Sequence, residues 1–198
     1  MLAAFPGYRA GVVVADGLGG PPADGIDVFA GLVPASLDHP HLAAWRDAFR
    51  AFGAKRHRCS AEALIARAGE VRRINPLVDR YNAVSMRWAV PVGGEDLDHV
   101  VPPVCLTFAT GSEPFDGGAE HPRAGEVVWV DRVGVTCRRW NWRQGVRTRL
   151  TDATTRAYFL FDALPVFGDA DLTAAMEDLC GLLRAGWPDA RLETSVVG

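Results

Sequence analysis

The chain has 198 residues, of which 48% are hydrophobic and 23% charged, and its formal net charge is −3. This composition is typical of a globular protein and excludes collagen-like, disordered and membrane-spanning classes, because no apolar run approaches the ~18 residues that cross a bilayer. The length suits one domain, which we place over residues 1–198. The first residues, MLAAFPGYRAG, lack the charged and apolar regions of a signal peptide, so we expect a cytoplasmic protein.

Charge is unevenly distributed along the chain. Residues 45–87 hold ten Lys/Arg and four Asp/Glu, and residues 131–156 hold seven Arg and two Asp. Two interpretations are open at this point. The segments form a basic face that binds a polyanion, or they are amphipathic segments whose arginines are simply solvated.

The N-terminal part predicts one strand followed by two helices. Residues 8–15 contain the apolar run of a buried strand, and a loop rich in Gly and Pro follows without the spacing of a dinucleotide-binding turn. Residues 41–52 repeat apolar side chains at helical spacing and predict an amphipathic helix. Ser60 is a suitable cap for a second helix over residues 60–69.

The middle of the chain predicts a sheet. Alternation of apolar and polar residues predicts short strands at 81–90, 104–108, 126–130, 135–142, 146–150 and 156–161. The stretches 91–103 and 110–125 are rich in Gly, Pro and acidic residues and are expected to be loops. A final helix is expected over residues 171–184. Helices around a many-stranded middle predict an α+β fold with a mixed, largely antiparallel sheet system flanked by helices.

The sequence CRRWNWRQ, residues 137–144, is the most unusual stretch. On a pleated strand, Arg139, Asn141 and Arg143 share one face, which suits a carboxylate, a phosphate or a nucleotide edge. Trp140 and Trp142 lie on the other face, where we expect them to pack into the core.

The same stretch continues into a predicted basic ribbon. Arg147 and Arg149 follow a turn expected at Gly145, so that with Arg138 they extend the positive charge over two strands. We expect these three arginines to contact nucleic acid.

Cysteine and histidine spacing favours neither metal nor covalent chemistry. The four cysteines have no zinc-ligand spacing and are expected to be reduced thiols, and the pair His39 and His41 lacks a third ligand nearby. No nucleophile signature is present. We therefore expect no metal, no cofactor and no covalent intermediate.

Four segments carry a family resemblance. In this order they are INPLVDRYNAVSMRWAVPVGGEDLD, VCLTFATGSEPFDGG, GEVVWVD and RTRLTDATTRAYFLFDA. Together they resemble the B3/B4 domain of the bacterial phenylalanyl-tRNA synthetase beta subunit, in its free-standing form, over residues 45–167. The resemblance implies the B3/B4 fold and a site where tyrosine wrongly attached to the phenylalanine tRNA is hydrolysed by a positioned water.

Individual residues follow from this resemblance. Asn82 matches an asparagine of the synthetase, Asp131 matches the aspartate that closes the strand before its pocket, and Thr154 and Thr155 match threonines that lead into its last pocket strand. CRRWNWRQ stands where the synthetase has a glycine-rich turn. The synthetase's histidine before its FD pair has no counterpart in VGGEDLD, and the glutamate that recognises the tyrosine hydroxyl falls near Phe161 or Asp162.

Three functions are compatible with these residues. The first is an aminoacyl-tRNA deacylase acting in trans, in which Arg139 and Arg143 hold the substrate carbonyl or the terminal phosphate. Its pocket is predicted to contain Asn82, Ser85, Asp131, Asn141 and Thr154. The second is a non-catalytic module that binds tRNA or another RNA through the basic ribbon. The third is a pocket that binds an amino acid or a similar carboxylate through Arg139 and Arg143.

Overall fold

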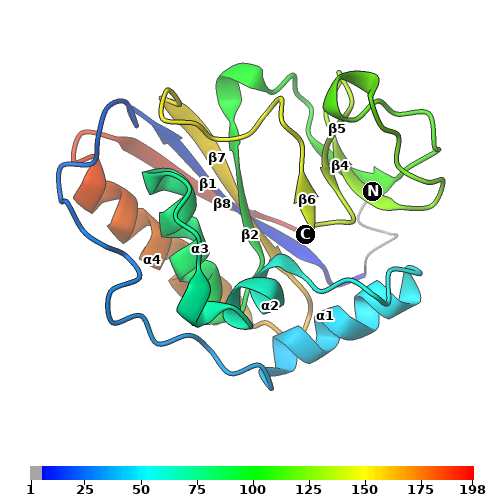
Figure 1. The fold of residues 1–198 in the computed structure, drawn as a ribbon, viewed down its shortest axis with the longest axis horizontal. Coiled ribbons are helices and arrows are strands. Elements are labelled where there is room, and N and C mark those ends of the chain that lie inside the picture. Colours follow the sequence, from blue (N-terminus) through cyan, green and yellow to red (C-terminus); the bar gives the residue numbers. More distant parts are fainter. Residues whose placement is uncertain (1–5) are drawn as a thin grey trace.

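A computed structural model describes residues 6–198 and confirms the α+β fold (Figure 1). Its α-helices are α1 (Pro40–Ala51), α2 (Ser60–Ile65), α3 (Pro76–Trp88) and α4 (Asp169–Gly186). Its strands are β1 (Arg9–Asp16), β2 (Val92–Asp96), β3 (Cys105–Phe108), β4 (Val127–Val130), β5 (Val135–Arg138), β6 (Arg143–Gln144), β7 (Arg156–Ala163) and β8 (Arg191–Val197). In this described part of the chain, no helix is both long and apolar enough to cross a membrane.

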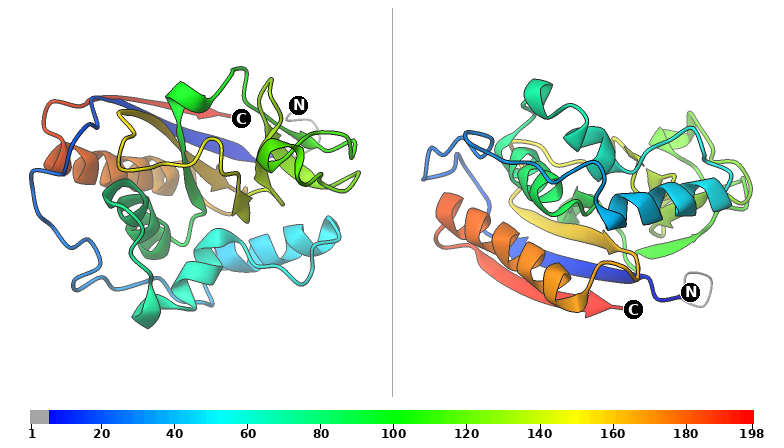
Figure 2. Two further views of the ribbon diagram at one scale, coloured as in Figure 1. Left: turned by 45° about the horizontal axis from the view of Figure 1, so that its top comes forward. Right: turned by 90° about the horizontal axis from the view of Figure 1, so that it is seen from below.

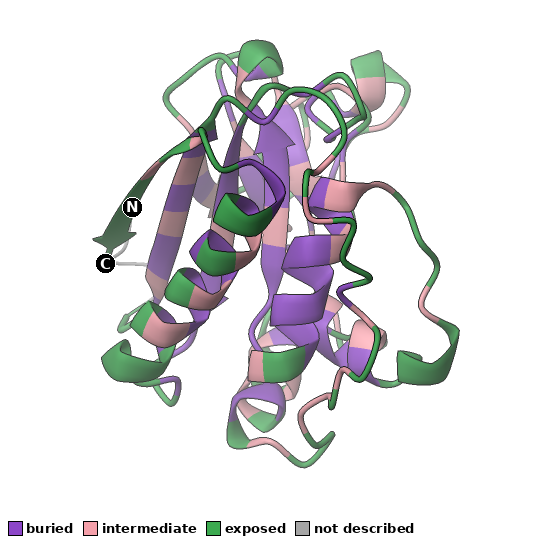
Figure 3. Ribbon diagram, turned by 90° about the vertical axis from the view of Figure 1, so that its left-hand side faces the viewer, coloured by how far each residue is buried: buried purple, intermediate pink, exposed green. Residues whose placement is uncertain are grey.

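The first sheet has the strand order β2-β7-β1-β8, and all of its neighbours are antiparallel. Helices α3 and α4 cover one face of this sheet, where Val13, Phe159 and Phe161 pack against apolar side chains of both helices (Figure 2). Figure 3 shows the consequence: α3 is mostly buried, α4 has a buried side and an exposed side along its length, and β8 is an exposed edge.

The second sheet has the order β3-β4-β5-β6 and is also antiparallel. Its core is aromatic, because Trp140 packs edge-on against Trp45 of α1 and against Tyr8, with ring centroids 4.9 and 5.4 Å apart. His41 at the start of α1 is buried in the same region, where Nδ1 bonds to the Ala89 carbonyl and Nε2 accepts from Trp45.

The two sheets meet along β2. The Gln144 side-chain amide donates to the Gly94 carbonyl, and the Asp96 amide donates to the Thr148 carbonyl at 2.8 Å. In Figure 1, β6 accordingly lies between β2 of the first sheet and β5 of the second. The space between the sheets is closed on a third side by α2 and α3.

The expected strand over residues 81–90 is wrong, because residues 81–88 belong to α3 and Ala89 caps its C-terminal end. Asn75 caps the helix by accepting from the Val78 amide, and Pro76 occupies its first turn. The apolar run that looks like strand alternation instead surrounds a helix that is buried on most of its surface.

The expected strand over residues 135–142 is confirmed only for residues 135–138, which form β5, because the chain turns within CRRWNWRQ. Arg139 and Trp140 have φ values of 49° and 65°, and the turn joins β5 to β6 as an antiparallel pair. Strand alternation therefore ends at Arg138. Trp140 is 4% exposed, as expected for a core residue, whereas Trp142 is 39% exposed.

Three further differences concern short elements. Residues 146–150 form no strand and make only an isolated bridge between Arg149 and Glu95, and the second helix ends at Ile65 rather than at residue 69. The stretch 91–103, expected to be a loop, contains β2, and β8 was not expected. Both strands are recognised only by pairing with distant segments, which local alternation does not reveal.

Candidate functional site

A cavity of about 450 Å³ lies between the two sheets and α2–α3. One wall is the face of β7 that carries Tyr158, Leu160 and Asp162, together with Glu95 of β2. The opposite wall consists of Trp129, Cys137 and the turn from Trp140 to Gln144. A concave, largely apolar space with a few converging polar groups is the usual form of a small-molecule site.

Asp162 is the carboxyl group on the cavity wall nearest the aromatic core. It is 2% exposed, and its Oδ1 accepts from the Tyr8 hydroxyl. Burial raises the pKa of Asp162 to about 7, against the opposing effect of hydrogen bonds from Tyr8 and Asn141. A carboxyl group with such a pKa can take up and release a proton near neutral pH.

Asn141 connects this carboxyl group to α2. Its Nδ2 donates to Oδ2 of Asp162 at 3.2 Å, and its Oδ1 accepts from the Ser60 amide at 3.3 Å. The turn within CRRWNWRQ makes this contact possible, because it directs Asn141 into the cavity while Trp140 packs into the core behind it.

Glu95 is a second buried carboxyl group on the same wall. Its Oε2 accepts from the Tyr158 hydroxyl at 2.7 Å, and the two residues are direct cross-strand neighbours. Burial raises the pKa of Glu95, against the opposing effect of hydroxyl groups on Tyr158, Thr136 and Thr148. In residues 6–198 no ion pair involves either Glu95 or Asp162.

The structure brings three of the expected pocket residues together. Asn82 of α3, Asn141 and Arg143 all line this cavity. Arg143 lies at the rim, where its guanidinium pairs with Glu120 at 2.7 Å and with Asp116 at 3.3 Å. It therefore already has anionic partners within the protein.

The other expected pocket residues lie elsewhere. Ser85 is fully buried and donates to the Val90 carbonyl, and Thr154 donates to Asp96 and lines a second, smaller cavity. Thr155 is exposed, and its carbonyl accepts from the Gly17 and Leu18 amides. Asp131 follows β4 and accepts from the amides of residues 101, 133 and 134.

The arginines of the expected basic ribbon are largely engaged inside the protein. Arg138 is 7% exposed and pairs with Glu126 and Glu120, which raises its pKa. Arg147 pairs with Asp131 at 2.7 Å, and Arg149 is exposed. The pairing offsets much of the positive charge that the sequence places over residues 131–156.

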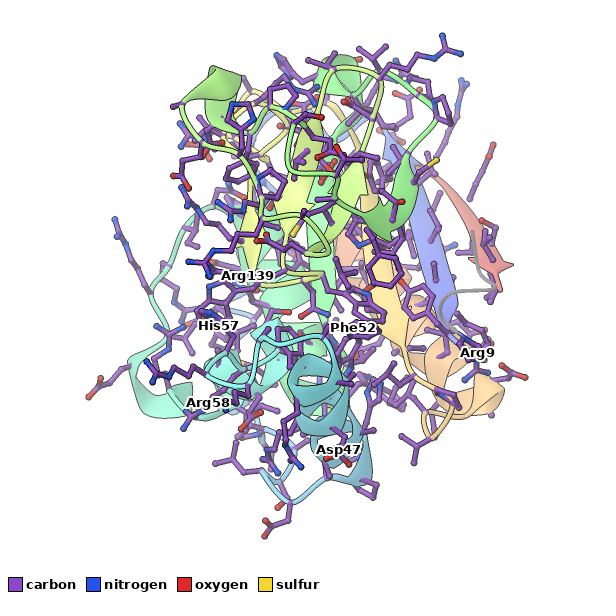
Figure 4. The ribbon with its side chains drawn as sticks, turned by 90° about the vertical axis from the view of Figure 1, so that its right-hand side faces the viewer. Arg9, Asp47, Phe52, His57, Arg58 and Arg139 are labelled. Carbon is purple, nitrogen blue, oxygen red and sulfur yellow. The ribbon has the colours of Figure 1, made fainter. Side chains whose placement is uncertain are left out.

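A basic edge remains beside the cavity. It consists of the segment Lys55–Arg58 and Arg139, which lies at the turn after β5 (Figure 4). Figure 4 shows Arg139, His57 and Arg58 following one another on one face. The ring of His57 also packs at a tilt against Trp142, with a centroid distance of 5.4 Å, and burial and then the charge of Arg139 lower the pKa of His57. This edge adjoins the cavity, because Trp142 lines the cavity and contacts His57 of the edge.

Sequence reasoning did not select the two buried carboxyl groups. Glu95 lies in a stretch expected to be a loop, and Asp162 ends an apolar strand. One pattern in the sequence pointed to Asp162. Tyr158, Leu160 and Asp162 occupy every second position of a strand and so share one face, which places a carboxyl group among largely apolar neighbours. The two glycines before Glu95 are a second signal, since glycine inside a strand often marks close approach of a ligand or another chain segment.

Comparison with known proteins identifies the family of the chain. A family model described as the B3/4 domain matches residues 44–166. The chain belongs to the B3/4 domain family, which confirms the resemblance found in the sequence. β1, α4 and β8 lie outside the matched residues and complete the first sheet and its helical cover.

Among solved structures, the protein is similar to an N-terminal fragment of the phenylalanyl-tRNA synthetase beta subunit from Pyrococcus horikoshii. The identity is 12% and the TM-score is 0.47. The match covers 64% of this chain and 47% of that one, so it spans about half of the longer fragment. No curated protein matches the sequence.

Proposed function

We propose that this protein hydrolyses the ester bond of wrongly charged aminoacyl-tRNA in trans. Membership of the B3/4 domain family and the four sequence segments shared with the synthetase editing domain support this reaction class. The observation that carries the proposal is Asp162, a buried carboxyl group on the wall of the cavity, held by Tyr8 and Asn141. Because the substrate is made in the cytoplasm, the proposal places the protein there.

The reaction needs only water and the ester. The ionised Asp162 takes a proton from a water molecule, whose oxygen forms a bond to the ester carbonyl carbon. The bond between that carbon and the ribose oxygen then breaks, and the protonated Asp162 returns its proton to the ribose oxygen. The products are the free amino acid and a tRNA with a free terminal hydroxyl. A pKa of about 7 suits both proton transfers.

The basic edge supports the RNA part of the proposal. Arg58 and Arg139 place positive charge on the face that carries His57, whose ring contacts Trp142 of the cavity wall, and the phosphates next to the aminoacylated end would lie there. Lys55 and Arg56 are exposed in the same segment as His57 and Arg58. The exposed indole of Trp142 offers a stacking surface for a terminal base.

A panel of mischarged tRNAs tests the proposal. The unmodified protein is expected to release the amino acid from at least one of them, at a rate that rises with pH up to about 7 and then levels, because the base must be ionised. Asp162→Asn is expected to lower this rate by about 10²-fold or more, since general-base catalysis contributes that much. Hydrolysis no faster than in buffer over the whole panel would overturn the proposal.

The basic edge by itself favours a second candidate, an RNA-binding module without catalysis. Its affinity for tRNA would fall steeply with salt. In a plot of log affinity against log salt concentration, each phosphate that the protein neutralises contributes about one unit of slope. Arg139→Ala combined with Arg58→Ala is expected to reduce that slope. Binding of tRNA without hydrolysis of any panel member would select this candidate, and absence of tRNA retention at low salt would remove it.

A further inference from the structure

Two buried carboxyl groups line the interior of the cavity. Glu95 and Asp162 are buried on its wall, and within residues 6–198 neither has an ion-pair partner. The two arginines that line the cavity do not form ion pairs with these carboxyl groups. Arg67 lies at the exposed rim, where its Nε donates to the Ala63 carbonyl, and Arg143 pairs with Glu120 and Asp116.

The two carboxyl groups lie at separate places along the cavity. Glu95 is opposite Tyr158, and Asp162 is four residues further along the same strand. Four residues correspond to roughly 13 Å along a strand, so one small group does not contact both carboxyl groups at once. Between them the cavity wall consists of Gly93 and Leu160, which form the next cross-strand pair.

The lining of the cavity suits a cation rather than an anion. Besides Tyr158, which donates to Glu95, aromatic side chains line other parts of the cavity, among them Tyr81, Trp129 and Trp142. The faces of such rings attract ammonium and guanidinium groups, and a carboxylate supplies the charge-assisted hydrogen bonds that offset desolvation of the cation. Gly93 leaves open space on the path from Asp162 to Glu95, because a Cβ atom there would have no neighbour within 4 Å.

From these contacts we infer that the cavity selects aminoacyl groups with a basic side chain, whose cationic end binds Glu95 while the ester lies near Asp162. The inference rests on the proposed function for the position of the ester. The ligands that the cavity would select share a positive charge at the end of an extended side chain, carried by an ammonium or a guanidinium group.

Amino acid amides test this inference without tRNA, because they carry the α-ammonium group and a neutral carboxyl end. L-Lysinamide, L-argininamide and L-norleucinamide have side chains of similar length, and only the first two carry a terminal cation. Calorimetric titration of the unmodified protein is expected to show that at least one of the cationic amides binds about tenfold or more tightly than norleucinamide, as a buried charge-assisted hydrogen bond implies.

Two variants test whether Glu95 causes the preference for a cationic amide. Glu95→Gln retains an acceptor for the Tyr158 hydroxyl and is expected to remove the preference for a cationic amide. Glu193→Gln makes the same charge change on the exposed strand β8 and is expected to retain the preference. Equal binding of all three amides to the unmodified protein, or binding of none, would overturn the inference, and neither result depends on how a variant folds.

The amide titration and the tRNA panel test separate claims, so either can give a negative result without the other. A clear preference for a cationic amide together with no hydrolysis of any aminoacyl-tRNA would remove the proposed reaction and leave a site for basic ligands. Hydrolysis confined to apolar aminoacyl groups, with no preference among the amides, would retain the reaction and remove the inference about Glu95.

Discussion

Asn141 holds the buried carboxyl group of Asp162 against α2, because its side-chain amide donates to Oδ2 at 3.2 Å while its oxygen accepts from the Ser60 amide at 3.3 Å. A residue from the turn of a short hairpin thus connects the last long strand of one sheet with the start of a helix.

Removing this contact should weaken the fold. Asn141→Ala leaves Asp162 without one of its hydrogen-bond donors, so the free energy of unfolding should fall by about 1–2 kcal/mol. The pKa of Asp162 should rise further, since the contact with Asn141 lowers it. Urea unfolding measures the first effect and NMR titration of the carboxyl carbon the second. An unchanged midpoint and an unchanged pKa would show that the contact contributes nothing.

Asp162 should make the protein less stable as pH rises. Its pKa is raised in the folded state, from 3.8 to about 7, so between these values the folded chain holds a proton that the unfolded chain has lost. Stability from this group is therefore complete below about pH 4 and is lost as pH rises through 7. Asp162→Asn, which cannot ionise, should be more stable than the unmodified protein at pH 8 by on the order of 1–3 kcal/mol.

The comparison of these two proteins at several pH values isolates the contribution of Asp162, because Glu95 titrates in both. The difference in free energy of unfolding between them should shrink towards pH 4. A difference that is the same at pH 4 and pH 8 would contradict the assignment of the raised pKa to this carboxyl group.

Gly93 and Gly94 should respond in opposite ways to a larger side chain. A Cβ atom at Gly93 meets nothing within 4 Å, whereas one at Gly94 lies 2.7 Å from Leu150 and 2.9 Å from Phe159. Gly93→Leu should therefore fill the cavity, preserve stability and lower ligand binding or hydrolysis by about tenfold or more. Gly94→Ala should lose about 1–3 kcal/mol of stability. Thermal unfolding and activity of both variants separate the two effects, and full activity of Gly93→Leu would place the substrate elsewhere.

Trp140 and Trp142 should differ sharply in their importance for stability. Trp140→Ala removes a buried ring from the aromatic core beside Trp45 and should cost about 3–5 kcal/mol. Trp142→Ala removes an exposed ring and should change stability by about 0.5 kcal/mol or less. Its effect should appear in tRNA affinity instead. Similar losses of stability in both variants would argue against the turn at Arg139 and Trp140.

The sequence predicted several elements well, for identifiable reasons. Helices α1 and α4 have apolar side chains at helical spacing over three or more turns, and β1 and β7 are long enough for an apolar run to be distinctive. The prediction of a strand over residues 81–90 was wrong because a helix that is buried on most sides has no polar face, so its sequence does not show the helical repeat. β2 and β8 failed because their pairing partners, β7 and β1, are distant in the chain.

The sequence by itself determined the fold class, the family and the importance of CRRWNWRQ, because each depends on local patterns or on ordered motifs. Only the tertiary structure decided what that stretch does. Two residues with positive φ turn the chain there, bury Trp140 and direct Asn141 towards Asp162. The cavity itself, with Glu95 and Asp162 on one wall, depends on the register between β2 and β7, and register is set by packing across the whole sheet.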